Sequence, residues 1–319
     1  MHDWRPSTQI ELLHRRARLI SLIRQFFAER NILEVETPLL SRATVTDPYV
    51  IGIPAIFKAI GSSKEQTLYL QTSPEYAMKR LLAAGSGPIY QICKAFRQGE
   101  VGTIHNPEFT MLEWYRPGFD HHALMNEMDE LLQIVLNTPS AKRLSYSDAF
   151  LNYVNIDPHH ATLEELAVRV KQEAIIYEEA DRNTFLDLLL THCIEPNIGK
   201  ECPVFLYDFP VSQAALAKIR LEDPPVASRF EVYFKGVELA NGFHELQDAK
   251  EQRKRFENDL AYRAKNNISA APIDEFFLSA LEHGLPDCAG VALGIDRLMM
   301  LALGQDNIKD ILSFEFGRA

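Results

Sequence analysis

The sequence lacks the short motifs that mark the most common nucleotide and hydrolase sites. It contains no Gly-x-x-x-x-Gly-Lys phosphate loop and no Gly-x-Gly-x-x-Gly dinucleotide turn. It also contains no His-Glu-x-x-His zinc helix and no Gly-x-Ser-x-Gly nucleophile elbow. A nucleotide site in this protein must therefore be built in another way.

The sequence also has few cysteines, no long apolar run and no net positive charge. The four cysteines form no Cys-x-x-Cys pair, which is typical of thiols in a reducing cytoplasm. There is neither a stretch of 18 apolar residues nor an apolar signal core at the N-terminus, so we expect a cytoplasmic protein without a membrane partner. The 319 residues carry a formal net charge of −11, which disfavours non-specific binding to nucleic acid.

Hydrophobic periodicity predicts a mixture of helices and strands. We expect helices at 8–30, 73–85, 119–137, 163–174, 184–194, 248–266 and 296–303, strands at 32–40, 203–209, 229–246 and 290–295, and a hairpin over 96–115. Strands joined as hairpins favour an antiparallel β-sheet flanked by helices. The predicted fold class is therefore α+β, in a single domain over residues 1–319.

Local signals place the ends of several elements. Thr8 is a possible N-cap of the first helix, and Pro38 ends the strand that follows. For the helix at 73–85 we expect Ser73 at the N-cap, Pro74 at the first helical position and Glu75 in the first turn.

The hairpin over residues 96–115 combines apolar strands with a polar loop. Alternate residues of a strand share a face, so Glu113 and Tyr115 lie on the same face as Phe109 and Met111. A carboxylate on an apolar sheet face is costly unless it is paired. Glu113 therefore needs a cationic partner, which is either a Lys or Arg of the protein or a ligand ammonium.

The loop of the hairpin begins at Arg97, whose guanidinium could clamp a phosphate in bidentate fashion. Phe109 could stack on a nucleobase, and Arg297 could do so from the other side. The alternative for each residue taken singly is a surface arginine or a core phenylalanine.

Two further stretches suggest a ligand site. Glu238 and Glu245 are seven residues apart, and a break at Asn241-Gly242 would let both carboxylates face one place. Mg²⁺ carrying nucleotide phosphates suits such a pair, whereas two solvated acids are the alternative. In GVALGIDRL, residues 290–298, small residues at Ala292 and Gly294 allow close approach to the backbone.

Taken together and in this order, these stretches resemble the lysine-type class II aminoacyl-tRNA synthetases. FRQGEVGTIHNPEFTMLEWY, residues 96–115, resembles their motif 2, and GVALGIDRLMMLALG resembles motif 3. NILEVETPLL resembles motif 1, which builds the dimer interface in that family. GVELANGFHEL resembles the lysyl-type metal-binding strand.

The resemblance implies a class II synthetase catalytic core and a set of roles. Arg97 and Arg297 would be catalytic, and Glu238 and Glu245 would hold Mg²⁺. The ATP site would comprise Arg97, Gln98, Gly99, His105, Asn106, Phe109, Glu238, Leu239, Gly294 and Arg297. The lysine-like substrate would contact Ser73, Pro74, Glu75, Glu113, Tyr115, Asn241, Glu245 and Ala292.

Two departures from the synthetase pattern narrow the function that we expect. Where the family has an acid that reads adenine, this sequence has Gly99, so Glu100 or a backbone carbonyl would substitute. The motif 1 helix is predicted to begin near residue 8, so we expect no anticodon-binding domain before it. With the acidic charge, this argues against tRNA as acceptor.

A catalytic core of this length, with SPEYAMKRLL and GVALGIDRL, resembles the elongation factor P–(R)-β-lysine ligases. The resemblance implies a homodimer that activates (R)-β-lysine or lysine with ATP and transfers it to a lysine ε-amine of elongation factor P. Ala292 stands where lysyl-tRNA synthetases have Gly, and its methyl would favour a β-amino substrate. A synthetase relative with a tRNA or small-amine acceptor, and a non-catalytic lysine sensor, are the alternatives.

Overall fold

The computed structural model describes residues 4–176 and 180–319, and these form two compact units. The first unit comprises Met1–Gly118, Gln247–Cys288 and Ala292–Ala319; the second comprises Phe119–Leu246 and Ala289–Val291. The single domain predicted over residues 1–319 stays a prediction. Residues 1–3 and 177–179 of that range lie outside the described residues.

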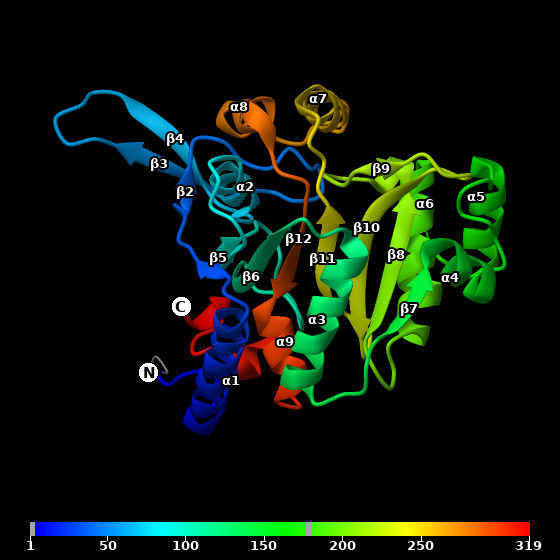
Figure 1. Cartoon of the computed structure of the whole chain (residues 1–319), viewed down its shortest axis with the longest axis horizontal. Helices are drawn as coiled ribbons and strands as arrows, with labels where there is room; N and C mark the ends of the chain where they lie inside the picture. Colours follow the sequence, from blue (N-terminus) through cyan, green and yellow to red (C-terminus); the bar gives the residue numbers. More distant parts are fainter. Residues whose placement is uncertain (1–3, 177–179) are drawn as a thin grey trace. The chain divides into compact units, whose positions relative to one another are not determined.

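The predicted α+β class is confirmed, with a large mixed β-sheet flanked by helices (Figure 1). The first unit contains α1 (Ile10–Glu29), β1 (Leu33–Glu34), β2 (Leu40–Ser41), β3 (Pro54–Lys58), β4 (Glu65–Leu70), α2 (Glu75–Ala83), β5 (Ile89–Phe96), β6 (Glu108–Pro117), α7 (Ala249–Lys265), α8 (Glu275–Gly284) and α9 (Ile295–Ala302), and most of β12 (Cys288–Gly294). Its strands follow the order β1-β5-β6-β12, and β2-β4-β3 form a small separate sheet that the sequence analysis did not predict.

The second unit contains the remaining strands and a group of shorter helices. These are α3 (His121–Leu136), β7 (Lys142–Ser145), α4 (Tyr146–Tyr153), α5 (Leu163–Gln172), α6 (Arg182–Leu189), β8 (Val204–Pro210), β9 (Ile219–Arg220), β10 (Val226–Phe234) and β11 (Val237–His244). The strand order is β11-β10-β8-β7, with β9 paired to β10. A buried cluster that includes Tyr146, Phe150 and Phe209 forms its core.

The predicted hairpins are antiparallel, and two other strand pairs are parallel. β5 pairs with β6, and β10 pairs with β8 and β11, all in antiparallel register. β1 pairs with β5, and β7 pairs with β8, in parallel register. Helices and other segments separate the members of each parallel pair along the chain, which is the long crossover that a parallel pair requires.

Helix α1 packs on the β5–β6 hairpin through its apolar stripe. The ring of Phe27 stacks on Tyr90 at 4.4 Å between centroids and meets Trp114 edge-on at 5.4 Å. Trp114 is fully buried and, because side chains alternate along β6, it faces away from Glu113. One face of the hairpin is thus core, and the other face is left for polar groups.

Two expectations about the first helix and strand were wrong. Gln9 precedes α1, while the Thr8 hydroxyl donates to the carbonyl of Asp310 and makes no helix cap. The strand expected over 32–40 is reduced to β1 and β2, because Pro38 lies between them and cannot donate a ladder hydrogen bond. In both cases a tertiary contact or a backbone constraint outweighed the local pattern.

Helix α2 begins one residue later than expected. Pro74 occupies the N-cap, and Glu75 is the first helical residue. The hydroxyl of Ser73 still accepts a hydrogen bond from the Glu75 N–H at 3.0 Å. Ser73 therefore satisfies a free N–H of the first turn, although it lies outside the N-cap position that we predicted.

The expected break at Asn241-Gly242 was also wrong, because β11 runs through both residues. Asn241 pairs with Glu231, and Gly242 pairs with Phe230. The irregularity lies at Leu239, an extra residue between the pairs Ala240–Val232 and Glu238–Tyr233. A one-residue bulge reverses the side-chain alternation, so Glu238 shares a face with Asn241.

Several helix starts have the caps that their sequences predict. Asp120 accepts from the Ala123 N–H before α3, and Thr162 and Glu165 form a reciprocal capping box at α5. The helix expected over 184–194 is α6 followed by a π turn at Leu190–Ile194. Within residues 4–176 and 180–319, no helix is long and apolar enough to cross a membrane.

Candidate active site

The polar face of the β5–β6 hairpin holds a buried carboxylate. Glu113 is 1% exposed, and both of its oxygens accept hydrogen bonds from hydroxyls. Ser73 donates to Oε1 at 2.5 Å, and Tyr115 donates to Oε2 at 3.0 Å. Three of the residues predicted to bind substrate are therefore brought together by direct contacts.

The environment of Glu113 opposes its ionisation. Burial is the largest cause, and the nearby charge of Glu75 adds to it, so that the pKa of Glu113 is raised to about 8. The hydrogen bonds from Ser73 and Tyr115 and the charge of Lys79 only partly offset this rise. A cation bound beside Glu113 would favour the ionised form.

The cationic partner that Glu113 requires is not supplied by an ion pair within the described part of the chain. The buried Lys79 ammonium instead lies 2.6 Å from Glu75 Oε1, one helical turn away on α2. Glu75 thus has a protein cation as partner, whereas Glu113 contacts two neutral hydroxyls. This arrangement favours the ligand ammonium over the internal salt bridge as the partner of Glu113.

The loop between β5 and β6 begins with Arg97, whose guanidinium lies 5.1 Å from the Phe109 ring centroid. Its Nη1 is 3.6 Å from Glu100 Oε1. Its Nε is buried and makes no hydrogen bond with any described residue. An arginine with a buried, unused donor fits a phosphate ligand better than a surface role.

The next two residues of the loop form its turn. The N–H of Gln98 donates to the Ile51 carbonyl at 2.8 Å. Gly99 has a φ of +84°, and a Cβ added to it would meet no described atom within 4 Å, so backbone conformation rather than space favours glycine here. The acid that the family pattern has there would be strained, while Glu100 lies beside Arg97.

The later part of the loop contacts the start of α9. Arg297 Nη2 lies 2.6 Å from His105 Nε2, and its Nε donates to the carbonyl of Ile104 at 3.3 Å. The structure therefore brings together two residues predicted to bind ATP from stretches almost 200 positions apart. Arg297 lies in the first turn of α9, three residues after the N-cap Gly294.

Asn106 has a structural role that the sequence analysis missed. Its amide Nδ2 donates to the Glu108 carbonyl at 2.6 Å, and its Oδ1 accepts from the Phe316 N–H at 3.0 Å. The predicted contact of Asn106 with ATP stays a prediction. No local sequence signal connects Asn106 to residue 316, so only the folded chain shows this bond.

Asp296 ties the end of β12 to the hairpin. Its Oδ2 accepts from the Thr110 N–H at 2.7 Å, and its Oδ1 forms an ion pair with Arg16 at 2.7 Å. This buried network holds the first turn of α9, and hence Arg297, against β6. Ala292 and Gly294 lie on β12 just before that turn, where both are partly exposed.

The residues predicted to hold Mg²⁺ belong to the second unit. Because of the bulge at Leu239, Glu238 and Asn241 share a face, and the alternation that continues from Asn241 places Glu245 on it too. Leu239 itself is buried. The structure thus explains how the carboxylates of Glu238 and Glu245 can lie on one face of β11. The cause is a bulge at Leu239 and not the predicted break at Asn241-Gly242.

This face carries further acids that the sequence analysis did not single out. Arg229 donates to Asn241 Oδ1 at 3.2 Å and to Glu231 Oε1 at 2.5 Å, and Tyr233 donates to Glu231 Oε2 at 2.5 Å. Burial, followed by the charges of Glu231 and Glu238, raises the pKa of Glu195 to about 7. The alternation of residues 229, 231 and 233 on one face of β10 could have identified them.

The residues present fit a divalent cation that also has ligands from a substrate. Carboxylate oxygens are hard ligands, and the crowding of negative charge near Glu238 would be relieved by a cation. No group of three or more His, Cys, Asp or Glu suited to a metal occurs among residues 4–176 and 180–319. This matches Mg²⁺ held by one or two carboxylates together with nucleotide phosphates.

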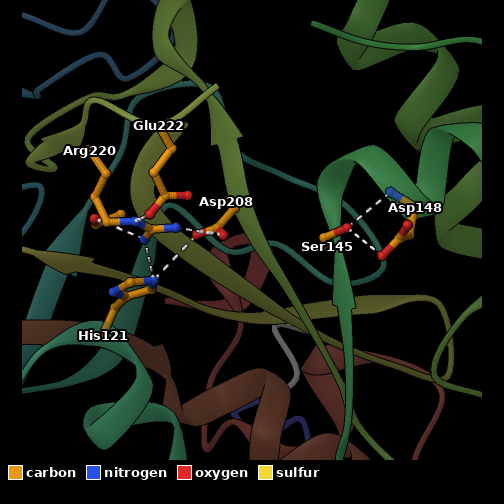
Figure 2. A network of polar contacts seen from close by, with 7 residues as sticks. His121, Ser145, Asp148, Asp208, Arg220 and Glu222 are labelled. Atoms are coloured by element: carbon orange, nitrogen blue, oxygen red, sulfur yellow. Dashed lines mark hydrogen bonds and ion pairs between the residues drawn. The ribbon is translucent and has the colours of Figure 1, made fainter. Parts of the chain in front are cut away.

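A second polar network of this unit lies on other residues (Figure 2). Arg220 donates to Asp208 at 2.7 Å and to Glu222 at 2.8 Å, and its Nη1 lies 2.9 Å from His121 Nε2. Burial opposes ionisation of Asp208, but bonds from His121 and Arg220 hold its pKa below the ordinary value. The network links α3, β8 and β9, which indicates a structural role.

The comparison with known families agrees with this geometry. The model of the family described as tRNA synthetases class II (D, K and N) matches residues 1–316. The chain therefore belongs to that family. Its members use ATP and Mg²⁺, and membership indicates an ATP-dependent amino-acid-activating ligase.

Proposed function

We propose that the protein activates (R)-β-lysine or lysine as an aminoacyl-adenylate and transfers it to the ε-amine of a lysine on elongation factor P. The observation that carries the first half is the buried carboxylate of Glu113, which two hydroxyls orient and no ion pair of the described chain neutralises. A substrate with a second ammonium group supplies what this site needs.

In the first step, a substrate carboxylate oxygen attacks the α-phosphorus of ATP, and pyrophosphate leaves. A carboxylate is already a nucleophile, so no protein base is needed. Arg97 offers its buried Nε and the rest of its guanidinium to the phosphate charge, and Arg297 offers a second guanidinium. Glu238 and Glu245 would hold Mg²⁺, which supplies charge neutralisation to the phosphates when bound.

In the second step, the acceptor ammonium loses a proton, and its nitrogen attacks the carbonyl carbon of the adenylate. The new C–N bond forms as the C–O bond to phosphate breaks, AMP leaves, and the amide nitrogen loses a further proton. Among the described residues, we assign none as the base that takes the first proton from the acceptor ammonium. The small side chain of Ala292 on β12 supports a pocket shaped for a β-amino group.

The choice of a protein acceptor rests on the sequence resemblance and on charge. A net charge of −11 disfavours a polyanionic acceptor such as tRNA. A lysine side chain as acceptor needs no basic surface on the enzyme. We infer that the enzyme acts in the cytoplasm as a homodimer.

The test is to incubate the protein with radiolabelled (R)-β-lysine, ATP, Mg²⁺ and elongation factor P. We expect label on the factor and amino-acid-dependent pyrophosphate–ATP exchange. Arg97→Ala should reduce exchange by about 10²–10³-fold, the usual cost of removing one preorganised charge donor. Undiminished exchange in this variant would contradict the proposed mechanism.

Three other outcomes would identify the alternatives. Label on tRNA or on a free amine, and none on elongation factor P, would assign a different acceptor. Lysine binding without any exchange would indicate a non-catalytic sensor. The intact pair Arg97 and Arg297 and the shared face of Glu238 and Glu245 favour catalysis over the sensor.

A further inference from the structure

Residues 307–318, which follow α9 in the first unit, are firmly attached to the rest of that unit. They contain two short 3₁₀ helices, Ile308–Ile311 and Phe316–Arg318. The apolar side chains at both ends of the first of these helices are buried. The N–H of Ser7 donates to the Ser313 carbonyl at 2.7 Å. This segment can therefore serve as a fixed support for whatever else it contacts.

The loop between β5 and β6 is held by this segment at two places. The N–H of Ile308 donates to the Thr103 carbonyl at 2.8 Å. The N–H of Phe316 donates to Asn106 Oδ1 at 3.0 Å. The two loop residues between these bonds contact the first turn of α9. Four consecutive loop positions are therefore held by α9 and by the segment that follows it.

Asn106 carries the second of these bonds to the base of the loop, where β5 and β6 meet. Its Nδ2 donates to the Glu108 carbonyl at 2.6 Å. The neighbouring Pro107 carbonyl accepts from the Arg97 N–H at 2.9 Å, and Phe109 is the next residue of β6. The Asn106 side chain therefore fixes the backbone between two residues that we assign to ATP, Arg97 and Phe109.

The N–H of Phe316 is a donor that its own helix cannot use. Phe316 is the first residue of that helix, whose first backbone bond runs from the Arg318 N–H to the Glu315 carbonyl at 2.9 Å. The Gly317 N–H donates to the Glu315 carboxylate at 2.8 Å. The Phe316 N–H is thus left for Asn106, whereas the ring of Phe316 is 59% exposed. The backbone, and not the ring, makes the contact with the loop.

We propose that segment 307–318 is a positioning element of the ATP site, which holds the loop through the N–H of Phe316 and the side chain of Asn106. In this role neither residue needs to touch ATP. A loop that is ordered before ATP binds loses less conformational entropy on binding, so its bonds to the segment favour ATP affinity. The inference rests on the proposed function for the nucleotide, but the order of the loop can be measured without any ligand.

Phe316→Pro removes this one donor. Proline suits the first position of a helix, and the extended backbone of Glu315, with φ −79° and ψ 167°, is compatible with a proline after it. Phe316→Ala is the matched control, because it removes the same ring and keeps the N–H. We expect ligand-free amide exchange over residues 98–108 to be about fivefold faster in Phe316→Pro than in Phe316→Ala, as for one neutral hydrogen bond.

The response to ATP is the second measurement. In pyrophosphate exchange, Phe316→Pro should raise KM for ATP several-fold relative to Phe316→Ala and leave KM for lysine unchanged. Asn106→Ala should speed amide exchange of the loop at least as much. Adding Phe316→Pro to Asn106→Ala should have no further effect, because both substitutions remove the same bond. If Phe316→Pro does not fold, loop exchange in Asn106→Ala decides.

Three results would overturn the inference. The first is equal loop exchange in Phe316→Pro and Phe316→Ala. The second is faster loop exchange with an unchanged KM for ATP, which would make the bond purely structural. The third is weaker ATP binding by Asn106→Ala with unchanged loop exchange, which would make Asn106 a direct ligand.

Failure of the proposed function is a separate outcome. If the unsubstituted protein shows no pyrophosphate exchange, the proposed adenylate chemistry fails. The dissociation constant for ATP, measured by equilibrium dialysis, then replaces KM. Weaker ATP binding by Phe316→Pro than by Phe316→Ala, together with faster loop exchange, would still support the positioning role, and equal binding would overturn it.

Discussion

At the scale of single residues, the chemistry of the first unit centres on Glu113. Its carboxylate is buried on a sheet face, and its contacts are a serine and a tyrosine hydroxyl. Both hydroxyls can rotate their protons toward the carboxylate, so they orient it without neutralising it. The remaining charge must be met by a proton or by a bound cation.

Substitution of Glu113 tests this directly. Glu113→Gln keeps the shape of the side chain but removes the charge, so we expect kcat/KM for lysine to fall roughly 30-fold, or about 2 kcal/mol. Melting temperature should change little or rise, because the variant no longer buries an ionisable group. Pyrophosphate exchange at varied lysine is the measurement, and unchanged kcat/KM would contradict the role.

The raised pKa of Glu113 predicts a dependence on pH. Between about 4.5 and about 8 the folded protein retains a proton that the unfolded chain releases, so this group's contribution to stability declines as pH rises through that window. An ammonium ligand binds the ionised form, so binding at pH 7 should release a proton. Calorimetry in buffers of different ionisation enthalpy measures it, and proton release should vanish in Glu113→Gln.

At the scale of elements, strand β11 has two irregular features: a bulge at Leu239 and a very close contact between Gly242 and the side chain of Phe230. The bulge at Leu239 turns Glu238 to the face of Asn241 and Glu245. Three residues later, a Cβ on Gly242 would lie 2.4 Å from Phe230 Cζ and 3.0 Å from Val291 Cβ. Glycine is needed at position 242 because Phe230 and Val291 leave no space for a Cβ. Its backbone conformation is one that other residues can adopt.

Gly242→Ala should therefore be costly. Overpacking of this kind destabilises by about 1–3 kcal/mol, which lowers the melting temperature by several degrees. Gly102→Ala is the control, because its Cβ would meet only His105 Nδ1 at 4.0 Å. Combining Gly242→Ala with Phe230→Leu should restore part of the loss; equal melting of Gly242→Ala and the unsubstituted protein would refute the packing argument.

Helix α7 holds the segment of residues 45–50 in place. The buried guanidinium of Arg263 donates to the carbonyls of Thr46 at 2.7 Å, Asp47 at 2.6 Å and Val50 at 3.0 Å. A single side chain thus satisfies several backbone acceptors of residues 45–50. Val45 lines a cavity of about 360 Å³ that Ser73 and Glu75 also line, so the shape of this cavity depends on Arg263.

Arg263→Met should release this segment. Loss of the donors leaves buried carbonyls unsatisfied, and we expect a cost of about 3 kcal/mol and faster amide exchange over residues 45–50. Hydrogen exchange read by mass spectrometry measures the effect. Arg253→Met on the same helix removes an exposed ion pair with Glu275 and should leave amide exchange over residues 45–50 unchanged. Equal exchange in both variants would show that Arg263 does not hold the segment.

At the scale of the whole molecule, charge and exposed apolar surface bear on partners. The net charge of −11 opposes polyanions. In the first unit, Leu33, Leu39 and Leu40 are exposed on the stretch that resembles motif 1. An apolar row of this kind is typical of a surface that another chain covers.

We predict that this row lies in a homodimer interface. Sedimentation equilibrium should give twice the mass of the chain, and Leu33→Asp should shift the equilibrium toward the monomer because it would bury an unpaired charge. Leu163→Asp, at an exposed position of α5, is the control and should sediment as the unsubstituted protein does. A monomer at micromolar concentration without substitution would exclude the dimer.

The sequence alone determined the class of fold and most of the elements. Periodicity and caps are local, so α3, the β5–β6 hairpin and the strand–helix junction at β12 and α9 follow from neighbouring residues. The same locality explains the errors at Thr8 and at Asn241-Gly242. A helix cap competes with the distant Asp310 carbonyl, and the position of a bulge depends on the partner strand.

Only the tertiary structure decided which groups meet and in what state. Contacts such as Arg297 with His105 or Asn106 with Phe316 join positions about 200 residues apart, and no local pattern encodes them. The raised pKa of Glu113 and the unbonded Nε of Arg97 arise from burial. Burial is a property of the packed chain, because it depends on every segment that excludes water from a site.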